Sequence, residues 1–233
     1  MLYLIGLGLD DGEITGKGLE ALREAEKAFA EFYTNTENID LGGLKEEAGT
    51  QIEKLERDEV EKQDRILEEA QNSEVAFLVS GDPLTATTHY DIKHRAEDAG
   101  IETEVIHAPS ILTSVAETGL NVYKFGRTVT LPEDSRPGSV LEYIEKNDSI
   151  ALHTLVLLDI DYPANEAAEK LVEMGVEPNR EVVVLERANS EDQDISVMSL
   201  EQAADAVFGA PPHSIILTRE KSHKEEEFIE NFK

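Results

Sequence analysis

Short apolar runs alternate with amphipathic stretches along most of the chain. Residues 2–5 and 75–79 are apolar at every position, and the second run has the pattern of a parallel strand that is buried on both faces of a sheet. After the first run, apolar residues recur at helical spacing, as Leu19, Leu22 and Ala25 do. Repeated alternation of strand and helix predicts an α/β fold with mainly parallel sheets.

Capping and turn residues divide this pattern into elements. Gly100 and Gly175 follow predicted helices, and Ser110 is a candidate N-cap. Ser199 and Gln202 have the spacing of a capping box. The predicted strands are residues 2–5, 27–33, 75–79, 102–106, 128–131, 150–158, 181–185 and 214–217, and the predicted helices begin near residues 15, 58, 85, 110, 139, 165 and 199, with an acidic helix at the end.

The alternation occurs once in each half of the chain. Residues 119–125 lie between the halves and follow neither the strand nor the helix period. We therefore predict an N-terminal α/β domain over residues 1–118 and a C-terminal α/β domain over residues 119–233.

Acidic residues outnumber basic ones by a wide margin. Asp and Glu number 50 and Lys and Arg number 21, which gives a net charge of −29 spread over predicted surface positions. This charge repels nucleic acid phosphates and anionic lipids, so neither nucleic acid nor a membrane is an expected partner. At about 1 M salt the screening length falls to ~3 Å and the self-repulsion is relieved. The composition favours a halophile, with an acidic protein of an ordinary cytoplasm as the alternative.

The chain contains no cysteine, which excludes disulfides, thiol catalysis and cysteine-ligated metals. The longest apolar runs are strand-length and therefore too short to span a bilayer. The first residues enter a predicted strand directly, without a basic leader. We expect a soluble cytoplasmic protein.

Two turn motifs follow predicted strands, where ligands of α/β sheets bind. Gly6 and Gly8 can admit a nucleotide or serve only a tight turn, and the spacing lacks the dinucleotide fingerprint, although Glu31 could act as a ribose-binding acid. Asp82 in Gly-Asp-Pro can hydrogen-bond a ligand or cap the next helix, and the turn interpretation is favoured without further context.

The histidines predict no metal site. His89 and His94 are five residues apart, so they do not share a helical face. His153 lies within a predicted strand and is interpreted as a core histidine. His213, at the start of the last predicted strand, is better placed for a ligand, although a structural role is again favoured. No residue is assigned as catalytic.

Several segments together resemble the diphthine synthases, a branch of the tetrapyrrole methylase-like enzymes that use S-adenosylmethionine. They occur in family order over nearly the whole chain, and their joint occurrence is specific where each alone is weak. They include Gly6-Leu7-Gly8-Leu9, Gly81-Asp82-Pro83-Leu84, Ile106-His107-Ala108-Pro109-Ser110-Ile111, Tyr123-Lys124-Phe125-Gly126, His153-Thr154-Leu155 and Pro212-His213-Ser214.

The resemblance implies two α/β domains of the tetrapyrrole methylase type, with S-adenosylmethionine in the cleft between them, and a homodimer. Apolar family positions would enclose the adenosyl group, and Asp82 and His213 would offer polar contacts. The chain is shorter than longer relatives after Ile160, which leaves substrate contacts of that segment open. The cofactor contacts carried over from the family are Leu9, Asp82, Thr85, Ser110, Ile111, Leu158, Ala188 and His213.

The implied reaction is methyl transfer in diphthamide biosynthesis. The family's substrate is a histidine of translation elongation factor two that bears a 3-amino-3-carboxypropyl group, whose amine takes successive methyl groups. Positioning alone can lower the barrier by ~7–11 kcal/mol, so no general base is demanded. The alternatives are methylation of a corrinoid or sirohaem-type tetrapyrrole, which the negative surface disfavours, and a non-catalytic acidic binding module.

Overall fold

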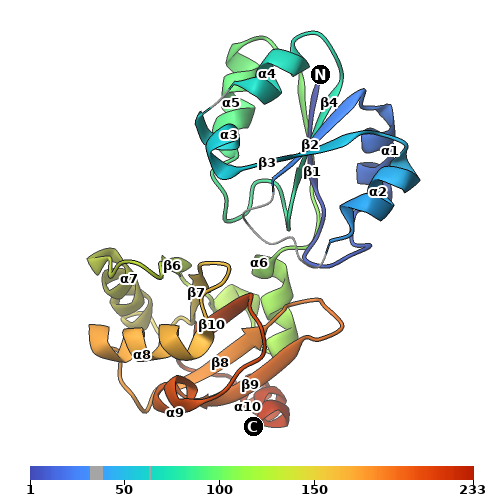
Figure 1. Ribbon diagram of the computed structural model, residues 1–233. Coiled ribbons are helices and arrows are strands. Elements are labelled where there is room, and N and C mark those ends of the chain that lie inside the picture. The colour runs from blue at the N-terminus through green and yellow to red at the C-terminus, as the bar shows by residue number, and fades with distance from the viewer. Residues whose placement is uncertain (32–38, 63) are drawn as a thin grey trace. The chain divides into compact units, whose positions relative to one another are not determined.

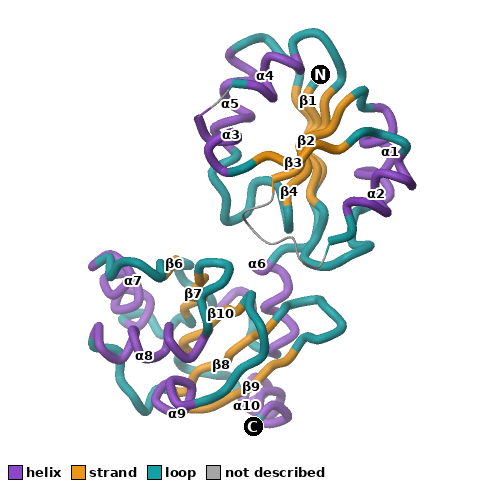
Figure 2. The backbone as a smooth tube through the Cα atoms, in the orientation of Figure 1, coloured by secondary structure: helices purple, strands orange, loops and turns teal. Residues whose placement is uncertain are grey.

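The chain forms two compact units, Met1–Leu112 and Thr113–Lys233. The computed structural model describes residues 1–31, 39–62 and 64–233, and each unit is drawn with its own sheet and helices in Figures 1 and 2. The domain boundary predicted after residue 118 lies six residues beyond the division between the units, and it stays a prediction.

The first unit is a five-stranded parallel sheet with helices on both faces (Figure 1). The order of its strands is β3-β2-β4-β1-β5. Its strands are β1 (Leu2–Gly6), β2 (Lys27–Glu31), β3 (Ile52–Leu55), β4 (Val75–Val79) and β5 (Thr103–Ile106), and its helices are α1 (Gly16–Glu24), α2 (Leu41–Ala48), α3 (Arg57–Lys62), α4 (Arg65–Ala70) and α5 (Tyr90–Asp98).

Alternate residues of the central strands supply two separate cores. Leu4 and Phe77 pack with α3, α4 and α5 on one face, whereas Ile5 and Leu78 pack with α1 and α2 on the other. Every residue of β1 and β4 is buried. The continuous apolar runs therefore arise because these strands lie in the middle of a sheet that is covered on both sides.

The second unit is built on a five-stranded mixed sheet of order β6-β7-β10-β8-β9. Its main apolar core joins one face of this sheet to three helices, α7, α8 and α9. The elements are α6 (Ile111–Ser114), which spans the division between the units, η1 (Val115–Thr118), η2 (Val122–Lys124), β6 (Val129–Leu131), α7 (Gly138–Asp148), β7 (Thr154–Leu158), α8 (Ala164–Met174), β8 (Glu181–Glu186), β9 (Asp194–Ser199), α9 (Leu200–Asp205), β10 (His213–Leu217), α10 (His223–Ile229) and η3 (Glu230–Phe232).

The two α/β units are confirmed, but the prediction of a mainly parallel sheet is wrong for the second. Only β6 and β7 pair in parallel, while β10 is antiparallel to β7 and to β8, and β8 is antiparallel to β9. Strand β9, which is the next strand after β8 and is mostly half-buried, was not predicted. Strand β9 runs antiparallel to β8. Helix α9 then connects β9 to β10, which lies between β7 and β8.

Local signals mark several boundaries correctly. Gly175 ends α8 in the left-handed conformation, and Ser199 and Gln202 form the predicted capping box of α9. The helix predicted to begin near residue 58 is instead two short helices, α3 and α4. Helix α2 and strand β3 were missed, and residues 32 and 33 of a predicted strand lie outside the described residues.

Candidate functional site

The loops after β1 and β4 touch each other through their glycines. The backbone N–H of Gly81 donates to the carbonyl of Gly8 at 2.6 Å, and the Gly8 N–H donates back at 3.2 Å. Gly8 and Gly81 both have positive φ, +83° and +70° respectively. A Cβ on Gly6 would lie 2.6 Å from the Gly81 oxygen. The glycines of both motifs are therefore required for close packing of these two loops.

This edge of the parallel sheet gathers the five candidate residues of the first unit. Strands β4, β1 and β5 are neighbours and run in the same direction, so the residues that follow them lie at one edge. Leu9 and Ile111 are half-buried apolar residues, and Ser110 is buried. The five are Leu9, Asp82, Thr85, Ser110 and Ile111.

Asp82 is held on both of its carboxylate oxygens. The Leu84 N–H and the Thr85 hydroxyl donate to Oδ1 at 3.0 and 2.9 Å. Oδ2 lies 2.6 Å from Nδ1 of His107. Burial opposes ionisation, but hydrogen bonds from the Leu84 amide and His107 outweigh it and hold the pKa of Asp82 below its ordinary value. Asp82 is thus an ionised turn residue with a histidine partner.

His107 belongs to the motif of residues 106–111, but the sequence indicated no role for it. It follows β5 directly, and its side chain is 71% exposed although that of Asp82 is only 8% exposed. The signal available in the sequence was its position at a strand end. Its pairing with Asp82, 25 residues away in sequence, emerges only from the alignment of β4 and β5 on either side of β1.

The second unit gathers its three candidate residues at one sheet edge as well. Strand β10 is antiparallel to β7 and β8, so its first residue, His213, lies beside the last residues of both. Leu158 ends β7 and is half-buried. Ala188, which is buried, follows β8 by two residues.

His213 is enclosed by its own unit. Its Nδ1 accepts the backbone N–H of Ala164 at 3.0 Å, and its Nε2 lies 3.5 Å from Oε2 of Glu186. The side chain has no exposed surface, and burial lowers its pKa, which favours the neutral ring. The Glu186 carboxylate also accepts the Gly209 N–H at 2.6 Å. The imidazole is therefore a structural tie within the second unit.

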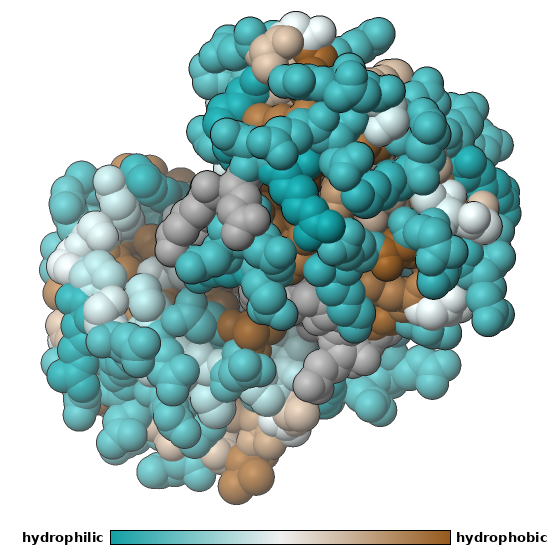
Figure 3. Space-filling view, turned by 45° about the horizontal axis from the view of Figure 1, so that its top comes forward, coloured by the Kyte–Doolittle hydropathy of each residue, from teal (hydrophilic) through white to brown (hydrophobic). Residues whose placement is uncertain are grey.

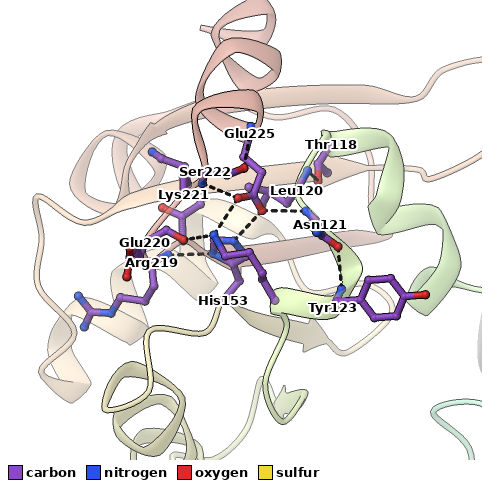
Figure 4. Close-up of polar contacts among 12 residues, drawn as sticks. Thr118, Leu120, Asn121, Tyr123, His153, Arg219, Glu220, Lys221, Ser222 and Glu225 are labelled. Carbon is purple, nitrogen blue, oxygen red and sulfur yellow. Dashed lines mark hydrogen bonds and ion pairs between the residues drawn. The ribbon is translucent and has the colours of Figure 1, made fainter.

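Figure 4 shows a further buried cluster, around Glu225. Its Oε2 accepts from Lys124 Nζ at 2.8 Å, and its Oε1 accepts the Asn121 N–H at 2.9 Å. His153 Nε2 lies 3.4 Å from Oε1, and its Nδ1 accepts the Arg219 N–H at 2.9 Å. His153 is confirmed as a core histidine. The cluster ties α10 to the loop before β6.

The described ranges also bear on metal binding and on membrane insertion. Residues 1–31, 39–62 and 64–233 contain no cluster of three or more acidic, histidine or cysteine side chains that could hold a metal ion. Within the same ranges, no helix has the length and apolar character needed to cross a bilayer.

Comparison with known proteins identifies the family. The model of the tetrapyrrole (corrin/porphyrin) methylases matches residues 1–204. The chain belongs to the tetrapyrrole methylase family. This assignment agrees with the two α/β units and the motifs at their strand ends, and it makes the chain a methyltransferase.

Within the tetrapyrrole methylases, the resemblance to diphthine synthases is confirmed over the full chain. Diphthine synthase of Halobacterium salinarum is 38% identical over 250 residues, which covers 98% of this chain and 96% of that protein. Human diphthine methyl ester synthase is 38% identical over 260 residues, covering 96% and 91%. A crystal structure of a putative diphthine synthase from Entamoeba histolytica superposes with a TM-score of 0.92 at 35% identity, covering 100% and 98%.

Proposed function

We propose that this chain transfers methyl groups from S-adenosylmethionine to the 3-amino-3-carboxypropyl histidine of translation elongation factor two, as a step of diphthamide biosynthesis. The observation that carries the proposal is the end-to-end similarity to diphthine synthases in both sequence and fold. A tetrapyrrole acceptor is not favoured, because the relatives named here are diphthine synthases and the net charge of −29 opposes an anionic macrocycle.

The candidate residues fit the donor by their apolar and backbone surfaces. Leu9 follows β1, Ile111 begins α6 and Leu158 ends β7. All three are half-buried, which suits contact with an adenosyl group. The positive-φ glycines bring the backbone of two loops to the same edge. Since both nitrogens of His213 face groups of the second unit, we propose that this position contacts the donor through its backbone.

The donor supplies an electrophilic methyl group on a sulfonium. The task of the protein is to align a neutral amine lone pair with that methyl carbon, and alignment can lower the barrier by about 7–11 kcal/mol. Rigid loops after β1 and β4 suit this task, since they are fixed by hydrogen bonds from Gly8, Gly81 and Leu84. The five candidate residues of this edge therefore belong to the donor site in our proposal.

The acceptor atom distinguishes two kinds of relative. The human protein is named for a methyl ester, which requires methylation of the carboxylate, whereas the Halobacterium protein is named for diphthine. We propose amine methylation for this chain. A product with a methyl group that is released by mild alkali would instead show ester formation, because an ester hydrolyses under conditions that leave a carbon–nitrogen bond intact.

The proposal also includes the setting of the enzyme. We propose a homodimer in the cytoplasm of a halophilic archaeon, supported by the resemblance to the family and by the excess of acidic residues. Similarity to the human and Halobacterium proteins is equal at 38%, so salt dependence requires its own test.

Calorimetry with S-adenosylhomocysteine, the product of the donor, tests the donor site. We expect one site per chain and a rise in melting temperature through mass action. Ile111→Asn should weaken binding about tenfold, the equivalent of ~1.4 kcal/mol. Leu112→Asn, at the neighbouring and more exposed position, is the matched control and should bind within about twofold of the wild type. Absence of both heat and thermal shift in the wild type would remove the methyltransferase proposal.

A further inference from the structure

We propose that His107, oriented by Asp82, accepts the proton that the acceptor amine releases in each methyl transfer. This inference rests on the proposed function and assigns a base that the sequence alone did not indicate. It concerns a histidine that follows β5 at the same edge as the candidate residues Leu9, Ser110 and Ile111.

The contacts of Asp82 determine which ring nitrogen of His107 can act. The carboxylate cannot turn freely, because Oδ1 holds the Leu84 N–H and the Thr85 hydroxyl. Oδ2 therefore faces Nδ1 of His107 at 2.6 Å and favours a proton on that nitrogen. The neutral ring then carries its lone pair on Nε2, and the 71% exposed side chain keeps the ring open to an incoming group.

The other histidines do not combine these features. His89, His153 and His213 are buried. His94 and His223 are exposed, but they lie on helices α5 and α10 rather than at a strand end. Only His107 among the six joins an exposed ring, a buried carboxylate partner and the sheet edge that bears the donor-site candidates. This combination is the arrangement in which a carboxylate orients a histidine as a base.

The proton balance of the reaction requires an acceptor at each turn. An ammonium first gives a proton to Nε2 of His107, which leaves a neutral amine and an imidazolium. The amine lone pair then forms a bond to the methyl carbon, while the carbon–sulfur bond breaks and its electron pair stays on sulfur. The product amine is again an ammonium, so a further transfer to it needs another deprotonation. The imidazolium returns its proton to water.

Charged groups at this edge of the sheet come from several elements. Asp82 lies directly against the ring. The loop after β1 contributes Asp10 and Glu13, and the Glu13 carboxylate accepts the Leu9 N–H at 2.6 Å. Glu104 of β5 is paired with Lys17 at 2.6 Å, which neutralises the nearest charge on its own strand. The charge at this edge is therefore mainly negative.

A structural role for His107 is the competing explanation. In that case the ring only fixes the turn of Asp82, and any side chain that preserves the hydrogen bond will serve. His107→Asn separates the two roles, because the asparagine amide can donate to Asp82 from the place of Nδ1 but offers no base. His94→Asn is the matched control, since His94 is also an exposed histidine beside a carboxylate. Its Nε2 lies 3.8 Å from Oδ2 of Asp98.

The experiment measures methyl transfer to elongation factor two between pH 6 and 9, together with S-adenosylhomocysteine binding. For His107→Asn we expect kcat at pH 7 to fall about 10²-fold, as for loss of a general base, with the dissociation constant within about twofold. The deficit should shrink as pH rises, and added imidazole should restore part of the rate. His94→Asn should match the wild type throughout.

Three results would overturn the inference. His107→Asn with the rate and pH profile of the wild type would show that the ring is not the base. A variant whose rate loss follows weaker binding or a lower melting temperature, without a change of pH profile, would show a structural role. A wild type that binds S-adenosylhomocysteine but never methylates the factor would overturn the proposed acceptor as well.

Discussion

Each unit of this protein places a histidine–carboxylate pair at the sheet edge that carries its candidate residues, yet the two pairs differ in exposure. In the first unit, the ring of His107 is 71% exposed and Asp82 is buried. In the second unit, both His213 and Glu186 are buried. In our proposal the first pair exchanges a proton with the substrate, whereas the second pair, which is enclosed by its own unit, stabilises the fold.

The difference follows from sheet topology. In the first unit, His107 stands in a loop beyond the end of β5, at the margin of a parallel sheet. In the second, His213 is the first residue of β10, a strand flanked on both sides by β7 and β8. A ring within a central strand is covered by its neighbours, so pairs of similar residue types differ in exposure.

The largest effect that sharpens this comparison is expected from Asp82→Asn. The amide oxygen can still accept from Leu84 and Thr85, but its NH2 group would face Nδ1 of His107 and force the other tautomer. We expect methyl transfer to fall about 10²–10⁴-fold, the usual contribution of a positioned base, while the melting temperature changes little.

Asp98→Asn is the matched control, because Asp98 accompanies the exposed His94. Steady-state rates and thermal melts of both variants decide the outcome. If Asp82→Asn chiefly lowers the melting temperature and leaves the rate intact, the carboxylate serves only the turn.

The second unit should respond through stability rather than catalysis. His213→Leu removes the acceptor of the Ala164 N–H and exposes Glu186 to an apolar neighbour. We expect the free energy of unfolding to fall by ~2–4 kcal/mol, the range for leaving buried polar groups unpaired. His213→Asn, whose amide oxygen can replace Nδ1, should recover part of that loss.

Denaturant titration in concentrated KCl measures these free energies, and the pH–rate profile of the folded fraction should keep its shape. A His213 variant of normal stability with a shifted pH–rate profile would show that His213, and not His107, exchanges protons with the substrate.

The sequence predicted where the strands and caps lie better than it predicted which distant residues contact each other. The apolar run of β4, the stop at Gly175 and the Ser199 cap are local signals, and all three were correct. The pairing of Asp82 with His107, and the burial of His213 by two strands, depend on register between distant segments. Strand β9 was missed because a half-exposed edge strand has little apolar pattern.

Acid should weaken the second unit before the first. Burial lowers the pKa of His153 and of His213, so the unfolded chain binds these protons first as the pH falls below about 6.5. Stability is then lost by at most about 1.4 kcal/mol per pH unit for each histidine. The pKa values of Glu225 and Asp82 are lowered. The stability that their ionised forms contribute is therefore fully present above the ordinary carboxyl pKa and is lost only as the pH falls through the lowered values.

Hydrogen exchange at pH 7 and pH 5, in at least about 1 M KCl to screen self-repulsion, measures each unit separately. Amides of β8 and β10 should lose protection, while those of β1 and β4 should keep theirs. Equal loss in both sheets would contradict the assignment of the sensitivity to His153 and His213.

Salt should produce the smallest difference between the units, although it affects both. The first unit has 26 acidic and 10 basic residues and the second has 24 and 11, so their net charges of −16 and −13 are similar. Hydrophilic residues cover most of the face in Figure 3. We expect stability and activity to rise together as KCl increases from about 0.1 to 3 M, because the screening length shortens steeply. Circular dichroism melts that are flat over this range would contradict the proposed halophilic setting and leave the enzyme proposal standing.

Mass spectrometry of elongation factor two tests the proposed function most directly. The factor, carrying the 3-amino-3-carboxypropyl histidine, is incubated in concentrated KCl with this protein and with S-adenosylmethionine labelled in its methyl group. We predict that labelled methyl groups appear on that histidine side chain, resist mild alkali and are nearly absent with Asp82→Asn. A factor that stays unlabelled, although the protein binds S-adenosylhomocysteine and the donor is intact, would contradict the proposal.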